Sequence, residues 1–99
     1  MKIFRLAFGL ESPTKSPEEC KEIAETVALA SFPEGHTLIE AKGRWESARG
    51  PITEQTIILE VVGPAEWITE VLYAGHQYKK LADQDAVLFT QQDIDHQFI

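Results

Sequence analysis

The sequence has little cysteine, few basic residues and no long apolar run, and each shortage excludes a class of protein. Its single cysteine, Cys20, has no partner for an internal disulfide and no second thiol for a zinc site. The 9 lysine and arginine residues are outnumbered by 16 aspartate and glutamate residues, which disfavours nucleic acid as a partner. No apolar run approaches the roughly 20 residues that span a bilayer. We therefore expect a cytoplasmic protein without a nucleic-acid or membrane partner.

Catalytic and cofactor motifs are also missing. The sequence contains no glycine-rich phosphate loop, and its three histidines do not have the spacing of metal ligands. We predict no metal, no cofactor and no catalytic residue from these patterns. The balance favours a protein that is not an enzyme.

The length and composition indicate one small globular domain. The chain has 99 residues, of which 43% are hydrophobic and 25% charged. We expect residues 1–90 to form the domain and residues 91–99 to form a polar tail. Because a domain of this size buries a modest share of its surface, contacts between subunits would add stability.

Hydrophobic periodicity and turn residues predict four strands and two helices. Ser16, Pro17 and Glu19 together form a helix start, with an N-cap, a proline in the first turn and a capping-box glutamate. Pro33 predicts the end of that helix near Phe32. The expected strands are residues 2–9, 36–46, 52–62 and 86–90, and the expected helices are residues 16–32 and 65–82.

This order predicts an α+β fold of the ferredoxin-like βαββαβ type, a four-stranded antiparallel sheet with both helices on one face. The other face is then open, and we expect it to carry Leu38 and Ile58, with Ile3 or Ile52 near them. A second copy of the chain is predicted to cover part of this face, in a homotrimer or homodimer.

The central hairpin has a register that the alternation of residues predicts. Placing Ala41 opposite Ile57 keeps the apolar side chains of both strands on one face. The same register places Arg44 opposite Glu54 and predicts an ion pair between them.

The end of this hairpin is the candidate ligand site. Arg44, Trp45, Arg49 and Glu54 lie close together there, and an arginine fork beside an aromatic plane suits a planar anion such as a nucleotide. In the alternative interpretation, Trp45 packs in the core and Arg44 only pairs with Glu54. Both interpretations stay open at the level of the sequence.

The histidines support a different class of function. A small oligomeric α/β-barrel enzyme would use His36 or His76 for acid–base chemistry. That enzyme would place the histidine in a cleft between the helices and the sheet. Separately, His36, Glu40 and Glu60 are a candidate cluster on the open sheet face for a metal or for proton transfer, but alternating charges are more typical of a solvated face, and we favour that interpretation. A protein-interaction module without a pocket is a third alternative.

Three segments carry a resemblance to a known family: residues 6–10, residues 54–62, and residues 32–45 with the motifs Phe-Pro-x-Gly and Gly-x-Trp. They resemble a family of small bacterial proteins known only as a domain of unknown function, and the similarity spans nearly the whole chain. That family is similar in layout to the PII-like signalling superfamily, whose members commonly trimerise through their sheets and bind nucleotides or other small ligands between subunits. The resemblance implies a homo-oligomeric module that binds a small anionic ligand, such as a nucleotide that it sequesters or senses, or a protein partner.

Overall fold

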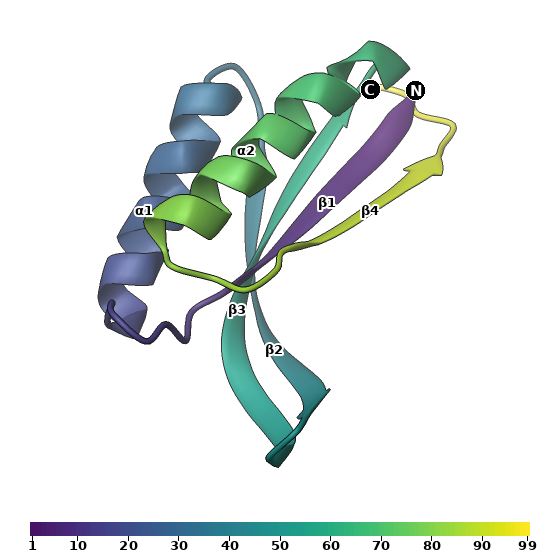
Figure 1. Cartoon of the computed structure of the whole chain (residues 1–99). Coiled ribbons are helices and arrows are strands. Elements are labelled where there is room, and N and C mark those ends of the chain that lie inside the picture. The colour runs from purple at the N-terminus through teal and green to yellow at the C-terminus, as the bar shows by residue number, and fades with distance from the viewer.

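A four-stranded antiparallel sheet carries both helices on one of its faces (Figure 1). This computed structural model describes the backbone of residues 1–99 and every side chain except that of Ser47. The strands lie in the order β2-β3-β1-β4, so the predicted ferredoxin-like βαββαβ fold is confirmed. The elements are β1 (Lys2–Gly9), α1 (Pro17–Ser31), β2 (Thr37–Ser47), β3 (Gly50–Gly63), the 3-10 helix η1 (Ala65–Trp67), α2 (Ile68–Leu81) and β4 (Leu88–Asp93).

The first helix begins and ends where the sequence predicts. The Ser16 hydroxyl accepts a hydrogen bond from the Glu19 N–H, and the Glu19 carboxylate accepts one from the Ser16 N–H, each at 3.1 Å. This reciprocal capping box satisfies two backbone donors that a helix start leaves without partners. The helix ends at Ser31, two residues before Pro33.

The second half of the chain departs from the predicted boundaries. The segment 65–82 is divided into a 3-10 turn and α2, with Trp67 at the junction. The last strand, predicted at residues 86–90, instead ends at Asp93 and includes three residues of the predicted tail. Asp93 lies opposite Lys2 of β1 and forms an ion pair with it at 3.0 Å. Pairing with β1 therefore extends β4 into a polar segment whose own sequence does not have the pattern of a strand.

The core lies between the two helices and the inner face of the sheet. Tyr78 of α2 is completely buried and stacks on Phe8 of β1, with 4.1 Å between ring centroids. Its hydroxyl donates a hydrogen bond to the carbonyl oxygen of Gly9, which satisfies the polar end of the ring. The other completely or almost completely buried side chains with large volume are Phe4, Leu6, Leu59, Val71 and Cys20.

The hairpin register differs by one residue from the predicted one. Ala41 lies opposite Thr56, and Arg44 lies opposite Thr53, so the predicted ion pair between Arg44 and Glu54 is wrong. A two-residue turn joins β2 to β3 and fixes this register, because strand pairing continues to the last residue before the turn. The turn predicted from the sequence was longer.

The same shift moves Leu38 to the helix side of the sheet, opposite Leu59, where it packs on the core. Leu38 was predicted on the open face, and that prediction was wrong. Ile58 and Ile3 do lie on the open face, since each alternates with a buried residue of its strand.

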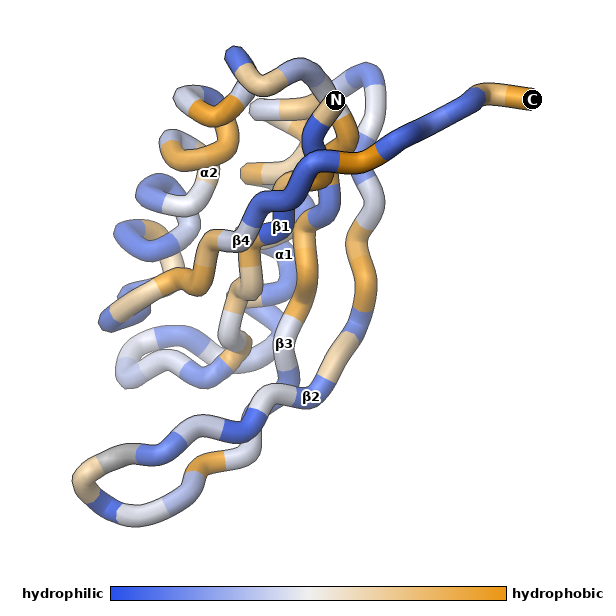
Figure 2. The backbone as a smooth tube through the Cα atoms, turned by 90° about the vertical axis from the view of Figure 1, so that its right-hand side faces the viewer, coloured by the Kyte–Doolittle hydropathy of each residue, from blue (hydrophilic) through white to orange (hydrophobic). Residues whose placement is uncertain are grey.

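The β2–β3 hairpin extends well beyond the ends of β1 and β4 and bends under the loops at the base of the helices (Figures 1 and 2). Its strands have 11 and 14 residues, whereas β1 and β4 have 8 and 6. The Ile94 N–H still donates to the Met1 carbonyl at 3.2 Å, and the chain after it extends away from the sheet without regular secondary structure (Figure 2). Neither helix in the described chain is both long and apolar enough to cross a membrane.

Candidate functional site

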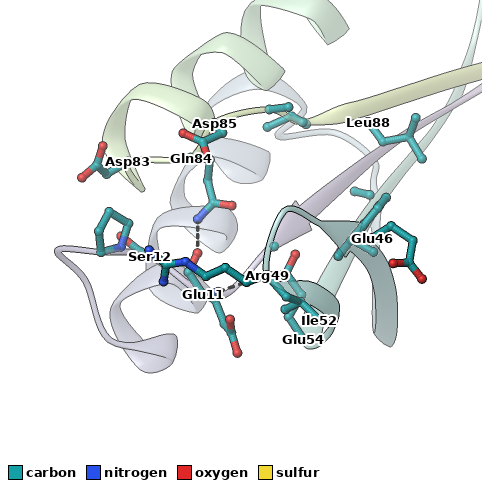
Figure 3. A pocket seen from close by; sticks show the side chains of 16 residues that line it. Glu11, Ser12, Glu46, Arg49, Ile52, Glu54, Asp83, Gln84, Asp85 and Leu88 are labelled. Atoms are coloured by element: carbon teal, nitrogen blue, oxygen red, sulfur yellow. Dashed lines mark hydrogen bonds between the residues drawn. The ribbon is translucent and has the colours of Figure 1, made fainter.

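A cavity of about 1050 Å³ lies between the projecting hairpin and two loops, the one after β1 and the one before β4 (Figure 3). By the strand register, the lining residues of β1, β3 and β4 and Trp45 of β2 face away from the helices, whereas Glu46 lies on the other side of the hairpin. The cavity is therefore a hollow of the open sheet face. Its lining comprises Ala7, Gly9, Glu11, Ser12, Pro13, Trp45, Glu46, Arg49, Ile52, Glu54 and the segment 83–88.

Hydrogen bonds hold the two loops of the cavity wall together. Asp83 has a φ of 53°, in the left-handed region, and ends α2 in a turn in which the Gln84 N–H donates to the Lys79 carbonyl at 2.9 Å. Gln84 then reaches the other loop, where its Nε2 donates to the carbonyl of Glu11 at 2.6 Å (Figure 3). The Thr14 hydroxyl donates to the Asp83 carboxylate at 3.1 Å. Loops that are far apart in the sequence thus form one wall.

The Glu54 carboxylate occupies space that only a glycine at position 9 leaves. A β-carbon on Gly9 would lie 2.7 and 2.9 Å from the two Glu54 oxygens and 3.0 Å from the Gln84 side-chain oxygen. Glu54 accepts one long hydrogen bond, 3.4 Å, from the Glu11 N–H, and it belongs to none of the ion pairs between described side chains. Much of its acceptor capacity is left for other partners.

Trp45 lies against the sheet beside the cavity, where Gly43 leaves room for it. The indole Nε1 and the Thr56 hydroxyl oxygen are each 3.1 Å from the position that a Gly43 β-carbon would take. Thr56 is only 3% exposed, and its hydroxyl is the one buried side-chain polar atom without a hydrogen-bond partner among the described residues. Such an atom is uncommon in folded proteins and calls for a partner.

Three of the four residues predicted as a ligand site meet in this cavity. Trp45, Arg49 and Glu54 line it, whereas Arg44 does not, because it faces the other side of the hairpin with Thr53. In Figure 3 the Arg49 side chain extends from the hairpin toward Glu11 and Ser12. That these residues bind a ligand stays a prediction. No local pattern in the sequence indicates the other lining residues from the two loops, which only the fold brings to the hairpin: Glu11, Asp83, Gln84 and Asp85.

The cavity is acidic rather than basic. Its lining includes one guanidinium, from Arg49, and carboxylates from both loops and the hairpin. The negative charge of Glu54 also reaches the core: burial, the neighbouring Cys20 and then Glu54 raise the pKa of the Tyr78 hydroxyl. The acidic lining residues are Glu11, Glu46, Glu54, Asp83 and Asp85.

The two histidines of the enzyme hypothesis lie outside the large cavity and apart from each other. His36 Nδ1 is 2.8 Å from the carbonyl oxygen of Phe32, next to α1. His76 lies on α2 and lines a separate hollow of about 180 Å³ with Lys79. Neither histidine lines the large cavity.

The candidate cluster of His36, Glu40 and Glu60 does not form on the open face, because Glu40 and Glu60 lie on opposite faces of the sheet. Glu40 lies on the helix side, where it pairs with Lys21 of α1 at 2.8 Å. Glu60 lies on the open face and pairs with Arg5 at 2.9 Å. No three His, Cys, Asp or Glu side chains gather as metal ligands in the described part of the chain.

Cys20 is an unreactive core residue in this structure. Burial raises the pKa of its thiol, and the carboxylates of Glu19 and Glu54 add to the effect. A raised pKa lowers the fraction of thiolate, which is the nucleophilic form.

The comparisons with known proteins agree with this fold. The chain belongs to the family described as "Protein of unknown function (DUF3574)". Its family model matches residues 4–98, nearly the whole chain. No curated protein matches the chain.

Several solved structures have the same fold. A phage SAM lyase in its apo state aligns with a TM-score of 0.72 and 13% identity, over 92% of this chain and 78% of that one. A CutA1 variant from Pyrococcus horikoshii OT3 aligns with a TM-score of 0.64 and 13% identity, over 99% and 87%. The PII-like protein CutA from Nostoc sp. PCC 7120 aligns with a TM-score of 0.54 and 13% identity, over 96% and 82%. At these identities the similarity shows the fold, and it confirms the PII-like layout expected from the sequence.

Proposed function

We propose that the protein is a homo-oligomeric module that binds a small molecule in the hairpin cavity, with a neighbouring copy closing the site. One observation carries this proposal: the cavity is a hollow of the same sheet face that lacks helices. A copy that packs on this face also lies over the cavity. The ligand would then bind at a subunit boundary.

Apolar side chains on the open face support self-association. Ile39, Ile52, Val62 and Leu88 lie there and are between 38% and 52% exposed. A concentration of apolar side chains on one face is typical of an interaction surface. A trimer is the assembly that the PII-like resemblance implies, and a dimer is the alternative.

The size and lining of the cavity support a small-molecule ligand. Its volume of about 1050 Å³ is comparable to the roughly 300–1,000 Å³ of known ligand pockets. Trp45 supplies an aromatic plane that suits a nucleobase, and Arg49 suits a carboxylate or phosphate. One similar structure is that of a SAM lyase, and SAM contains an adenosine group, so adenosine derivatives are the first ligands to test.

Two further points complete the proposal. We favour binding over an enzymatic role for His36 or His76, because neither histidine lines the cavity. We also propose a cytoplasmic location, which the buried free thiol of Cys20 supports.

Light scattering on the protein and on the variant Ile58→Lys tests the assembly. Ile58 lies near the middle of the open face, between Ala7 and Ile39 on the neighbouring strands. We expect the wild type to have the mass of a trimer or dimer and the variant to have a lower mass. Leu29→Lys is the matched control, because Leu29 is exposed on α1 in the helix layer.

A panel of adenosine derivatives, including AMP, ATP and SAM, then tests ligand binding through the shift in Tm. A monomeric wild type would refute the assembly. An oligomer whose Tm no member of the panel raises would refute the proposal for this ligand class.

A further inference from the structure

We infer that the cavity selects a ligand with a positively charged organic group, a sulfonium or quaternary ammonium, which the Glu54 carboxylate and the Trp45 indole contact directly. This inference rests on the proposed function, because it names the ligand class of the same site. It reverses the sign of charge that the sequence predicted. The reasons lie in the position of Glu54, in the residues around Trp45 and in the charge of the lining.

Glycines on both neighbouring strands leave space around Glu54. Gly43 lies directly opposite it on β2, and Gly9 of β1 leaves the space in which its carboxylate oxygens lie. Any side chain at position 9 would displace these oxygens, since a β-carbon there would be 2.7 Å from the nearer one. The carboxylate thus lies at the wall of the cavity in the space that Gly9 leaves, accepts one long hydrogen bond of 3.4 Å from the Glu11 N–H, and belongs to none of the ion pairs between described side chains.

Trp45 provides an independent observation beside this carboxylate. The face of an indole attracts cations, and it is the best side chain for binding quaternary ammonium groups. Trp45 lines the cavity while 41% exposed, so part of its ring is available to a ligand. The Thr56 hydroxyl, which lies near the same Gly43 position as the indole, is buried and does not line the cavity, whereas Trp45 does.

The charge of the lining explains why an anion alone is a poor fit. An anionic ligand would approach Glu54 and the carboxylates of both loops, with only the Arg49 guanidinium to offset them. A zwitterion is compatible with the whole lining, because its cation would contact Glu54 and its acidic group would face the Arg49 side of the cavity. The acidic loop residues increase the attraction for cations, but Glu54 gives it a defined position.

The experiment uses two pairs of probes that differ in charge and almost nothing else. SAM and S-adenosylhomocysteine differ by one methyl group and the positive charge on sulfur. Choline and 3,3-dimethyl-1-butanol have the same shape with and without the charge. Isothermal titration of the full-length protein should give at least about tenfold tighter binding for the charged member of a pair.

Two variants distinguish the contribution of Glu54 to the charge preference from the effect of the other acidic residues in the cavity. Glu54→Gln keeps the shape of the side chain and should bring the charged and neutral probes to equal affinity. Glu46→Gln removes the same charge from another lining residue and should keep the preference, since Glu46 points away from the cavity centre in Figure 3. Trp45→Leu should reduce the preference as well, and it provides a second test if Glu54→Gln changes the mass or the Tm.

Three outcomes would overturn the inference. The first is equal affinity for both members of each pair, and the second is an equal loss of preference in Glu54→Gln and Glu46→Gln. The third is tighter binding of AMP than of either cation, which would leave the proposed function intact and restore the anionic ligand. Failure of the proposed function itself would appear differently, as a monomeric wild type or as a Tm that no member of the wider panel raises.

Discussion

The hydroxyl group of Tyr78 offers the sharpest test of how the core supports the cavity. It donates a hydrogen bond to the carbonyl of Gly9, the residue on which the Glu54 carboxylate lies. Tyr78→Phe removes only this hydroxyl, because the ring keeps its stacking on Phe8. A buried carbonyl that loses its partner costs about 1–2 kcal/mol. For a domain of this length, each kcal/mol corresponds to roughly 4–8 °C in Tm, so we expect a decrease of roughly 4–16 °C.

Urea denaturation and thermal melting at equal protein concentration measure this loss, since the Tm of an oligomer depends on concentration. Tyr73→Phe is the matched control: Tyr73 is 61% exposed on the same helix, and the change should cost less than about 0.5 kcal/mol. The variant Tyr78→Phe should also weaken ligand binding, because the Gly9 backbone loses an anchor. A stability within about 0.5 kcal/mol of the wild type would refute the importance of this hydrogen bond.

Three other perturbations have defined outcomes. Gly9→Ala should lower ligand affinity far more than Tm, because its β-carbon displaces the Glu54 carboxylate, and titration beside a melting curve checks this. Ser16→Ala should lower the free energy of unfolding by about 1 kcal/mol in urea titrations, since it removes the α1 cap; an unchanged value would contradict the capping box. The pKa values of Cys20 and Tyr78 are raised in the folded state, because burial disfavours their ionised forms. Their contribution to the free energy of unfolding is therefore complete below the unfolded-state pKa values, about 8.5 and 10, and is lost as the pH rises through the folded-state values. Urea titrations at increasing alkaline pH should show falling stability, with a shallower fall in Tyr78→Phe; equal slopes would sink this explanation.

Local sequence signals predicted the order of the elements, because each signal acts over a few residues. The start of α1 depends on Ser16, Pro17 and Glu19, which are neighbours in the chain. Such local signals do not determine the register of the β2–β3 hairpin. It depends on whether Leu38 faces the core and on the length of the turn, and the alternation along β2 is compatible with both choices.

One part of the candidate site could also be predicted from local sequence, and the other part could not. Trp45, Arg49 and Glu54 belong to one hairpin, and their proximity follows from the strand pattern. The opposite wall is formed by residues such as Gln84 and Glu11, which meet only because β1 lies beside β4 in the sheet. The sequence could therefore indicate an aromatic residue and an arginine at a candidate site, but not the acidic lining on which the proposed ligand charge rests.

The shared location of cavity and interface gives the proposed assembly a thermodynamic consequence. If a neighbouring copy closes the cavity, ligand binding and assembly are linked, and each strengthens the other by the same factor. The open face can be buried in this way because its central charges, Arg5 and Glu60, already pair with each other at 2.9 Å across β1 and β3. A buried ion pair with both members present avoids the large cost of a single unpaired charge. Ligand occupancy would then regulate the oligomer without any change in the fold of the subunit.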